Sequence, residues 1–283
     1  MHGYRPSAAR RAVRIAARLV VRLLGLSGRS VWANELMQAL DPVATVPFDG
    51  RILRFRTGNG RLLWRVRTFL REEPLMLRWI AGMGADDVVL DVGANAGMYS
   101  AAMAQRARRV YACELDPLNV GLIKENAHLN GVADRVVVVP VACAERDEIV
   151  DVHFRDLAVG DALQSMGRPQ PIPTRMGSQP HVAPVLAMSL DELWRRAELP
   201  RPTKIKIDVD GNERTVLAGC RDLCRGAREI YYEDTDLPDS REVLAELLAL
   251  GFDEVDRETL AASTAPGGAG VVGFNRVLRR RGA

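Results

Sequence analysis

The sequence of 283 residues lacks the features that mark several classes of protein. Its four cysteines are too few for a disulfide scaffold at this length, and they include no CxxC pair that would begin a zinc site. The longest apolar runs fall short of the roughly 18 residues that a membrane-spanning helix needs. Hydrophobic residues make up 47% and charged residues 27%, which excludes an intrinsically disordered chain. We therefore expect a soluble, cytoplasmic protein that holds no metal.

Acidic residues are absent from the first thirty positions, which contain seven arginines. Arginines recur every four residues along one stripe of a predicted helix, and apolar residues form a second stripe: Arg14, Arg18 and Arg22 against Ile15, Leu19, Leu23 and Leu26. Such an amphipathic helix could make peripheral contact with an anionic membrane surface or pack on the chain itself, and we expect packing. No nucleic-acid-binding motif accompanies the charge, so we expect no nucleic acid partner.

The stretch that follows predicts a β-hairpin. TVPFDGRILRFRT and RLLWRVRT look extended, and Gly58-Asn59-Gly60 between them is a turn signal. A helix then opens at Pro74, where a first-turn proline is harmless. We therefore divide the chain into an N-terminal extension over residues 1–71, made of a basic helix and a hairpin, and a main domain over residues 72–283.

The main domain alternates predicted strands with helical patterns. The strands are rich in β-branched residues, as buried parallel strands require, and cover residues 88–92, 109–114, 135–142, 204–209, 229–234 and 271–278. This rhythm predicts an α/β fold with a mostly parallel sheet covered on both faces. Residues 154–187 break it with Pro, Gly and Ser, and we expect an irregular insert that serves as a lid or substrate wall.

The first strand of this domain leads into the segment with most information about a ligand, VVLDVGANAGMYS. Asp91 ends the strand, and Gly93, Asn95 and Gly97 follow at the entrance to a helix, where glycines let a ligand approach the backbone. The spacing is not the GxGxxG of dinucleotide sites, and the carboxylate would repel a pyrophosphate. The same carboxylate suits the amino group of S-adenosylmethionine, so this cofactor fits better than NAD.

The second strand ends at Glu114, 23 residues after Asp91. An acidic side chain there can accept hydrogen bonds from both hydroxyls of a ribose. Asp116 lies beside it in the next turn and is a further cofactor-binding candidate. An equally good interpretation makes Asp116 the cap of a helix that begins at Pro117.

Three ordered segments carry a resemblance to a known family. VLDVGANAGMYS, YACELDPLNVGLIKENAHLNG and KIKIDVDGNERTVLAGC together resemble the FkbM family of class I S-adenosylmethionine-dependent methyltransferases. The resemblance implies a Rossmann-like fold with strand order 3-2-1-4-5-7-6 and methylation of hydroxyl groups in sugars, polyketide products and related metabolites.

The resemblance also implies roles for individual residues. Asp91 and the turn after it would line the methionine end of the cofactor, Glu114 would bind the ribose, and Ala142 or Cys143 would lie near the adenine. Two departures concern the acceptor side. Asp210 stands where family members commonly have Glu, and GDALQSM replaces an Asn- and Ser-containing stretch.

The fourth strand supplies the candidates for proton transfer. Asp208, Asp210 and Glu213 follow one another at its end, and close like charges raise at least one pKa toward neutrality. Asp208 is our main candidate, with a second role in ordering the cofactor. Glu213 could instead belong to the start of the next helix. Glu233 and Asp234 end the fifth strand at the same edge, where they could bind the acceptor, take its proton or hold a divalent cation, although their spacing does not favour a metal.

We therefore predict an S-adenosylmethionine-dependent O-methyltransferase whose partner is a hydroxyl of a sugar, glycan or secondary metabolite. One alternative is an NAD-linked oxidoreductase, which shares the sheet and Glu114. Another is a module that binds S-adenosylmethionine without catalysis, suggested by the two departures from the family pattern.

Overall fold

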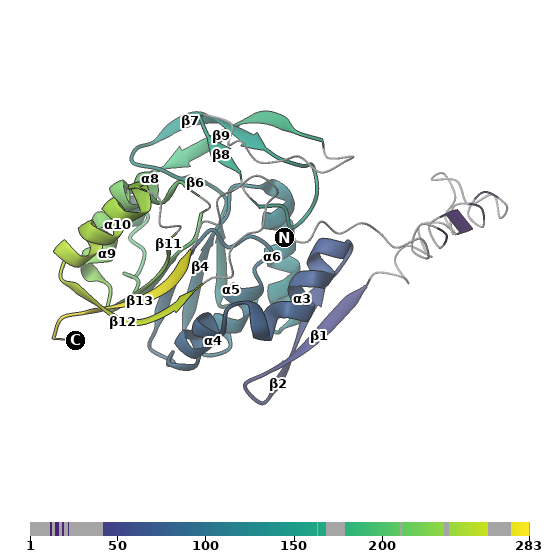
Figure 1. Cartoon of the computed structure of the whole chain (residues 1–283), viewed down its shortest axis with the longest axis horizontal. Helices are drawn as coiled ribbons and strands as arrows, with labels where there is room; N and C mark the ends of the chain where they lie inside the picture. Colours follow the sequence, from purple (N-terminus) through teal and green to yellow (C-terminus); the bar gives the residue numbers. More distant parts are fainter. Residues whose placement is uncertain are drawn as a thin grey trace.

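The computed structural model describes residues 42–162, 164–167, 179–209, 211–234, 238–259 and 273–282, together with five single positions between residues 12 and 22. Figure 1 shows a central sheet with helices on both sides and a smaller sheet above its upper end.

The central sheet has the order β12-β13-β11-β10-β3-β4-β5. Its strands are β3 (Val88–Val92), β4 (Arg109–Cys113), β5 (Val136–Val139), β10 (Lys204–Ile207), β11 (Glu229–Asp234), β12 (Phe252–Thr259) and β13 (Phe274–Arg280). All neighbours are parallel except β13, which is antiparallel to β11 and β12. Numbered along the chain, this order is 3-2-1-4-5-7-6, so the predicted Rossmann-like fold is confirmed. The sequence prediction missed β12.

Helices cover the two faces of the sheet with separate cores. One core contains the apolar sides of α3 (Gly60–Glu72), α4 (Pro74–Ala81), α5 (Met98–Ala104) and α6 (Pro117–Leu129). The other contains those of α7 (Leu190–Arg196), α8 (Glu213–Ala218), α9 (Arg221–Gly226) and α10 (Pro238–Ala249). The middle strand β3 is buried along its whole length, which explains its uninterrupted apolar pattern.

The predicted hairpin exists, but at a different position. Its strands are β1 (Val43–Phe48) and β2 (Arg51–Arg56), joined by a tight turn at Asp49 and Gly50 with positive φ angles. The second half of the prediction was wrong, because RLLWRVRT belongs to helix α3. The signal we took for a turn begins this helix, since the Asn59 side chain accepts hydrogen bonds from the N–H groups of Arg61 and Leu62.

The predicted irregular insert over residues 154–187 contains strands, and they pair with strands that precede it. β6 (Ala142–Cys143), β7 (Glu148–Phe154), β8 (Ser165–Met166) and β9 (His181–Met188) form a second sheet in the order β6-β9-β7-β8. β7 and β9 pair as a long antiparallel ribbon from Glu148 to Phe154. The predicted strand over 135–142 divides between β5 and β6 at Pro140, because proline cannot donate to a ladder. Residues 168–178 lie outside the described part of the chain.

Ile15 and Leu19 are the described members of the N-terminal apolar stripe, and their side chains are 59% and 51% exposed. The expected packing of the stripe on the domain is therefore wrong for these two residues. In the described part of the chain, no helix combines the length and apolar character needed to cross a membrane.

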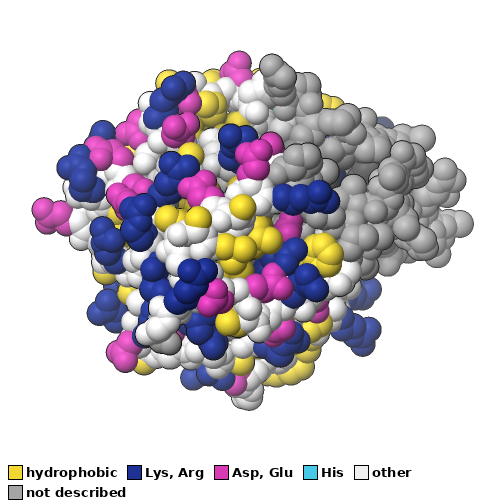
Figure 2. Space-filling view, turned by 60° about the vertical axis from the view of Figure 1, so that its left-hand side comes forward, with side chains coloured by type: hydrophobic (Ala, Val, Ile, Leu, Met, Phe, Trp, Pro, Cys, Tyr) yellow, Lys and Arg dark blue, Asp and Glu magenta, His cyan; other side chains and the backbone are white. Residues whose placement is uncertain are grey.

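Charged side chains of both signs mix on the surface formed on the side of α8 to α10. Figure 2 presents this side and shows basic and acidic groups interspersed over it. Several are ion pairs, among them Arg214 with Glu242 at 2.9 Å. This face therefore has no large field of one sign, although arginine dominates the basic residues.

Candidate active site

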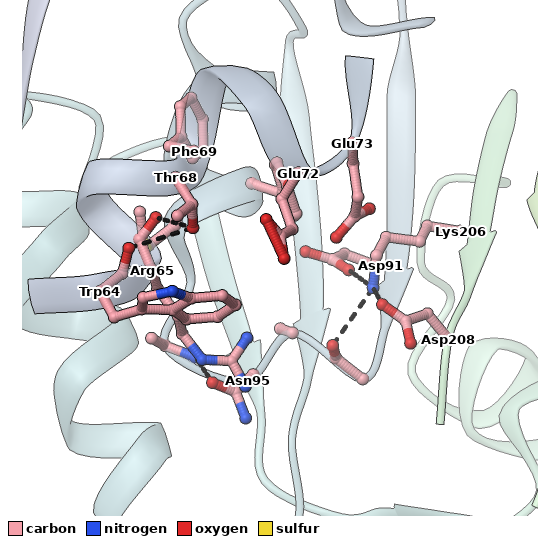
Figure 3. A pocket seen from close by; sticks show the side chains of 15 residues that line it. Trp64, Arg65, Thr68, Phe69, Glu72, Glu73, Asp91, Asn95, Lys206 and Asp208 are labelled. Atoms are coloured by element: carbon pink, nitrogen blue, oxygen red, sulfur yellow. Dashed lines mark hydrogen bonds and ion pairs between the residues drawn. The ribbon is translucent and has the colours of Figure 1, made fainter. Parts of the chain in front are cut away.

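Three segments far apart in the sequence line one pocket at the carboxyl ends of β3 and β10. Helix α3 contributes one side, the turn after β3 lies opposite, and the end of β10 completes the lining. Figure 3 shows Trp64 and Arg65 on one side of this pocket and the carboxylates of Glu73, Asp91 and Asp208 on the other. The topology thus collects acidic groups at the edge of the sheet where doubly wound proteins bind ligands.

Glycine is required at the turn after β3 for reasons of space. A Cβ atom on Gly93 would lie 1.8 Å from the backbone oxygen of Asp208, and one on Gly97 would lie 2.9 Å from Ile123. Both glycines have positive φ angles, and so does Asn95 between them, at 49°. The turn therefore passes directly against the end of β10, which brings the two acidic strand ends together.

A buried lysine, which the sequence analysis missed, joins these strand ends. Lys206 Nζ lies 2.9 Å from Asp208 Oδ2 and 3.4 Å from Asp91 Oδ1, and it donates to the Gly93 oxygen at 3.2 Å. Burial lowers the pKa of Lys206, but the charges of Asp208 and Asp91 outweigh it and raise the pKa above its usual value. The sequence did contain a signal for this pairing: Lys206 lies between two isoleucines in a strand predicted to be buried, and a buried lysine is rare unless it is paired.

Asp91 is fully buried at the bottom of the pocket. Its Oδ2 accepts a hydrogen bond from Ser100 Oγ at 2.5 Å. Among the described residues its Oδ1 accepts no hydrogen bond, and it forms an ion pair with the ammonium of Lys206. The structure therefore places Asp91 in the pocket with one oxygen still able to accept.

Asp208 has a more open position, with 28% of its side chain exposed. Burial raises its pKa, but the charge of Lys206 and hydrogen bonds from Glu233 and Lys206 prevail, and the pKa falls below its ordinary value. Glu233, the second catalytic candidate of this edge, therefore acts on Asp208 directly. The lowered pKa makes Asp208 a good partner for a cation and a weak base.

Glu73, between α3 and α4, is an acidic residue of the pocket that the sequence analysis did not single out. Its Oε2 accepts from Tyr231 Oη at 3.3 Å, and Tyr99 also hydrogen-bonds to it. Burial first, and then the charge of Asp208, raise its pKa to about 7. A carboxylate in the pocket with this pKa has the affinity for a proton that a base needs near neutral pH.

Glu114 and Asp116 lie side by side after β4. Both oxygens of Glu114 accept backbone hydrogen bonds, from Asn95 N at 2.7 Å and Asp116 N at 2.8 Å. Burial raises the pKa of Glu114 to about 7. Asp116 accepts from Leu118 N at 2.9 Å, which confirms that it caps α6. Binding of a ribose by either residue stays a prediction.

The remaining candidates lie apart from the pocket or have local partners. Ala142 is buried opposite Ala187 in the second sheet and does not line the pocket. The Glu213 carboxylate accepts from Gly211 N at 2.8 Å, which orders the turn before α8. Asp234 pairs with Arg276 at 2.8 Å. Asp210 lies outside the described residues.

Asp161, another residue that the sequence analysis passed over, ties the second sheet to the pocket. Its carboxylate is buried and receives hydrogen bonds from Arg61 and Arg155, each at 2.5 Å. Its backbone oxygen accepts from the side chains of Asn95 at 2.6 Å and Asn119 at 3.3 Å. The glycine-rich turn therefore depends on the segment that follows β7.

Comparison with known proteins agrees with this architecture. The sequence pattern of the methyltransferase FkbM domain matches residues 91–254, which is more than half of the chain. The hexuronic acid methyltransferase AglP from Haloferax volcanii is 26% identical over 190 residues, which cover 65% of this chain and 71% of that protein.

Two further matches are shorter or more distant. The ribosomal protein L11 methyltransferase of Acinetobacter baumannii is 39% identical over 88 residues, which cover 30% of this chain and 26% of that enzyme. The crystal structure of methyltransferase FkbM from Methylobacillus flagellatus has 15% identity and a TM-score of 0.44, covering 69% of this chain and 44% of that one. On the extent of the domain match, this chain belongs to the FkbM methyltransferase family.

Proposed function

We propose that the protein is an S-adenosylmethionine-dependent O-methyltransferase that acts on a hydroxyl group of a sugar. The observation that carries the proposal is the acidic pocket at the glycine-rich turn, in a chain of the FkbM family. The family assignment favours methyl transfer over the alternative of an NAD-linked oxidoreductase.

The residues present fit this cofactor. S-adenosylmethionine carries an ammonium and a sulfonium, and the pocket offers the carboxylates of Asp91, Asp208 and Glu73, of which Lys206 pairs with the first two. Asp91 Oδ1 is buried without a hydrogen bond, so a ligand donor would satisfy it. Gly93 and Gly97 keep the backbone of the turn free of side chains that would cover it. Glu114 is adjacent, bonded to the same turn, and would hold the ribose.

The chain's own residues provide alignment and a proton acceptor. When bound, S-adenosylmethionine supplies a methyl group that an acceptor oxygen can attack in a single displacement. The acceptor hydroxyl must lose its proton as the new bond forms, and Glu73 is the carboxylate whose pKa, about 7, suits this task. Asp208, held ionised by Lys206, would attract and orient the positively charged groups of the cofactor. Much of the rate gain comes from holding the reactants in line.

A sugar as the acceptor rests on the relatives. The match with AglP covers most of that protein, and its name assigns it a hexuronic acid as substrate. We propose the same chemical class here, a hydroxylated sugar, neutral or acidic, presented alone or on a glycan.

Calorimetric titration with S-adenosylhomocysteine, and in parallel with NADH, tests the cofactor. We expect micromolar binding of S-adenosylhomocysteine alone, and its loss in Asp91→Asn. Asp86→Ala is the matched control, because Asp86 is an exposed residue of the loop before the same strand. Binding of NADH alone would contradict the proposal.

Transfer of a labelled methyl group to neutral and acidic sugars tests the reaction. Glu73→Gln should bind S-adenosylhomocysteine but turn over slowly, and the rise of wild-type activity through about pH 7 should vanish with it. Binding in the wild type without transfer to any sugar, glycan or metabolite would favour the alternative of a non-catalytic binding module.

A further inference from the structure

Arg65 is a cation in the pocket to which the proposed function assigns no task. It lies on α3 and lines the pocket with Trp64 and Thr68. Its Nε is buried and has no hydrogen-bond partner among the residues that the structure describes. Within the described part of the chain, no acidic side chain forms an ion pair with it. A buried guanidinium nitrogen without an acceptor is unfavourable, and a ligand oxygen would relieve it.

The neighbouring cations are occupied. Lys206 is held between Asp91 and Asp208, and Arg61, one turn before Arg65 on α3, binds Asp161 at 2.5 Å. Arg65 therefore differs from both in having its donors available. Its charge still acts across the pocket on Asp208, whose pKa is lowered chiefly by Lys206 and to a smaller extent by Arg65.

The pocket is consequently divided by charge. Figure 3 shows Arg65 on the side of Trp64 and Asn95, the carboxylates of Glu73, Asp91 and Asp208 on the other side, and the exposed Glu72 between the two. A ligand with both an amine and an acid would be oriented by this division, because its anionic group is repelled from one side and attracted to the other.

The side chain starts from a rigid support. Helix α3 buries Leu62, Val66 and Phe69 in the core, and Asn59 caps its first turn. The position of Arg65 is therefore set before a ligand arrives, which reduces the ordering cost of binding.

We infer that Arg65 is a binding residue for a carboxylate of the ligands, and this inference rests on the proposed function. The planar guanidinium can donate two parallel hydrogen bonds to a carboxylate, which gives direction as well as attraction. Two ligands can supply that group: the methionyl carboxylate of the cofactor, and the carboxylate of a uronic acid acceptor. Their shared chemistry is what Arg65 recognises.

The experiment uses the full chain with Arg65→Gln, Arg65→Lys and the control Arg67→Gln. Arg67 is exposed on the same helix and does not line the pocket. Each variant is titrated with S-adenosylhomocysteine and with its decarboxylated analogue, which keeps the amine. If the cofactor supplies the carboxylate, Arg65→Gln weakens S-adenosylhomocysteine roughly tenfold to hundredfold and leaves the analogue unchanged. The affinity of Arg65→Lys for S-adenosylhomocysteine should be intermediate, because lysine keeps the positive charge but not the planar guanidinium that donates two parallel hydrogen bonds.

The acceptor is tested by the KM for methyl glucuronoside against methyl glucoside. If the acceptor supplies the carboxylate, Arg65→Gln raises the first KM by a similar factor, leaves the second unchanged, and leaves S-adenosylhomocysteine binding intact. The inference is overturned if every affinity stays at the wild-type value, or if charged and neutral ligands weaken equally. A wild-type chain that binds no S-adenosylhomocysteine would instead overturn the proposed function, and this inference with it.

Discussion

Glu73 gives the sharpest link between the pocket and the stability of the whole chain. Its pKa is raised from an ordinary 4.5 to about 7, chiefly by burial. At 1.36 kcal/mol per pKa unit, the ionised carboxylate costs the folded state roughly 3 kcal/mol. Glu73 is an acid with a raised pKa, so this cost is absent below about pH 4.5. The free energy of unfolding then falls as the pH rises from about 4.5 through about 7.

Glu73→Gln removes the charge and keeps an oxygen that can accept from Tyr231. We expect the variant to exceed the wild type in free energy of unfolding by about 3 kcal/mol at pH 8, and by less than about 1 kcal/mol at pH 5. Urea denaturation at the two pH values measures both differences. The variant should transfer methyl groups slowly in the same preparation, because the substitution that stabilises the fold also removes the proposed base.

Glu72→Gln is the matched control. Glu72 neighbours Glu73 and lines the same pocket, but it is exposed. Its replacement should produce no pH-dependent gain in stability. Our reasoning about burial is refuted if Glu73→Gln is equally or less stable than the wild type at pH 8, or if its gain is the same at both pH values.

Three other substitutions test the geometry of the site. Gly93→Ala brings a methyl group against the Asp208 backbone oxygen, so we expect a loss of about 2 kcal/mol or more in urea denaturation, and loss of S-adenosylhomocysteine binding in calorimetry; wild-type values for both would contradict the close approach. Lys206→Met leaves Asp91 and Asp208 without their cation and should cost about 3–5 kcal/mol at pH 7, less at pH 4 where carboxylates gain protons; a loss independent of pH would argue against the ion pairs. Asp161→Asn deprives two arginines of their partner, and we expect a similar loss of stability together with weaker S-adenosylhomocysteine binding, whereas unchanged binding would separate this residue from the glycine-rich turn.

Several features of the fold could be read from local patterns. A parallel strand buried on both faces is rich in β-branched and other apolar residues, and VVLDV shows this pattern. The close approach at Gly93 leaves room for no side chain, so glycine is required there, and the spacing of the glycines after the strand made the turn predictable. The sequence also contained the signals for helix α3, because Leu62, Val66 and Phe69 recur with helical period after the capping residue Asn59. We misassigned it because RVRT also alternates as a strand does.

The second sheet was harder to predict, because 26 residues separate β7 from β9 and the two strands meet only in the folded chain. The residues between the two strands have a composition that favours turns. Pairing between strands this far apart in the sequence produces no hydrophobic periodicity that a short stretch of sequence could reveal.

The sequence by itself determined the family, the order of the strands and the acidic residues at their ends. Only the tertiary structure decided which of those residues act on one another. Lys206 neutralises Asp91 and Asp208 because β10 lies beside β3, and Glu73 acquires its pKa because α3 and α4 bury it against the same strand ends. Charge and burial depend on neighbours brought together from distant parts of the chain, so a residue's type is written in the sequence, whereas its protonation is set by the fold.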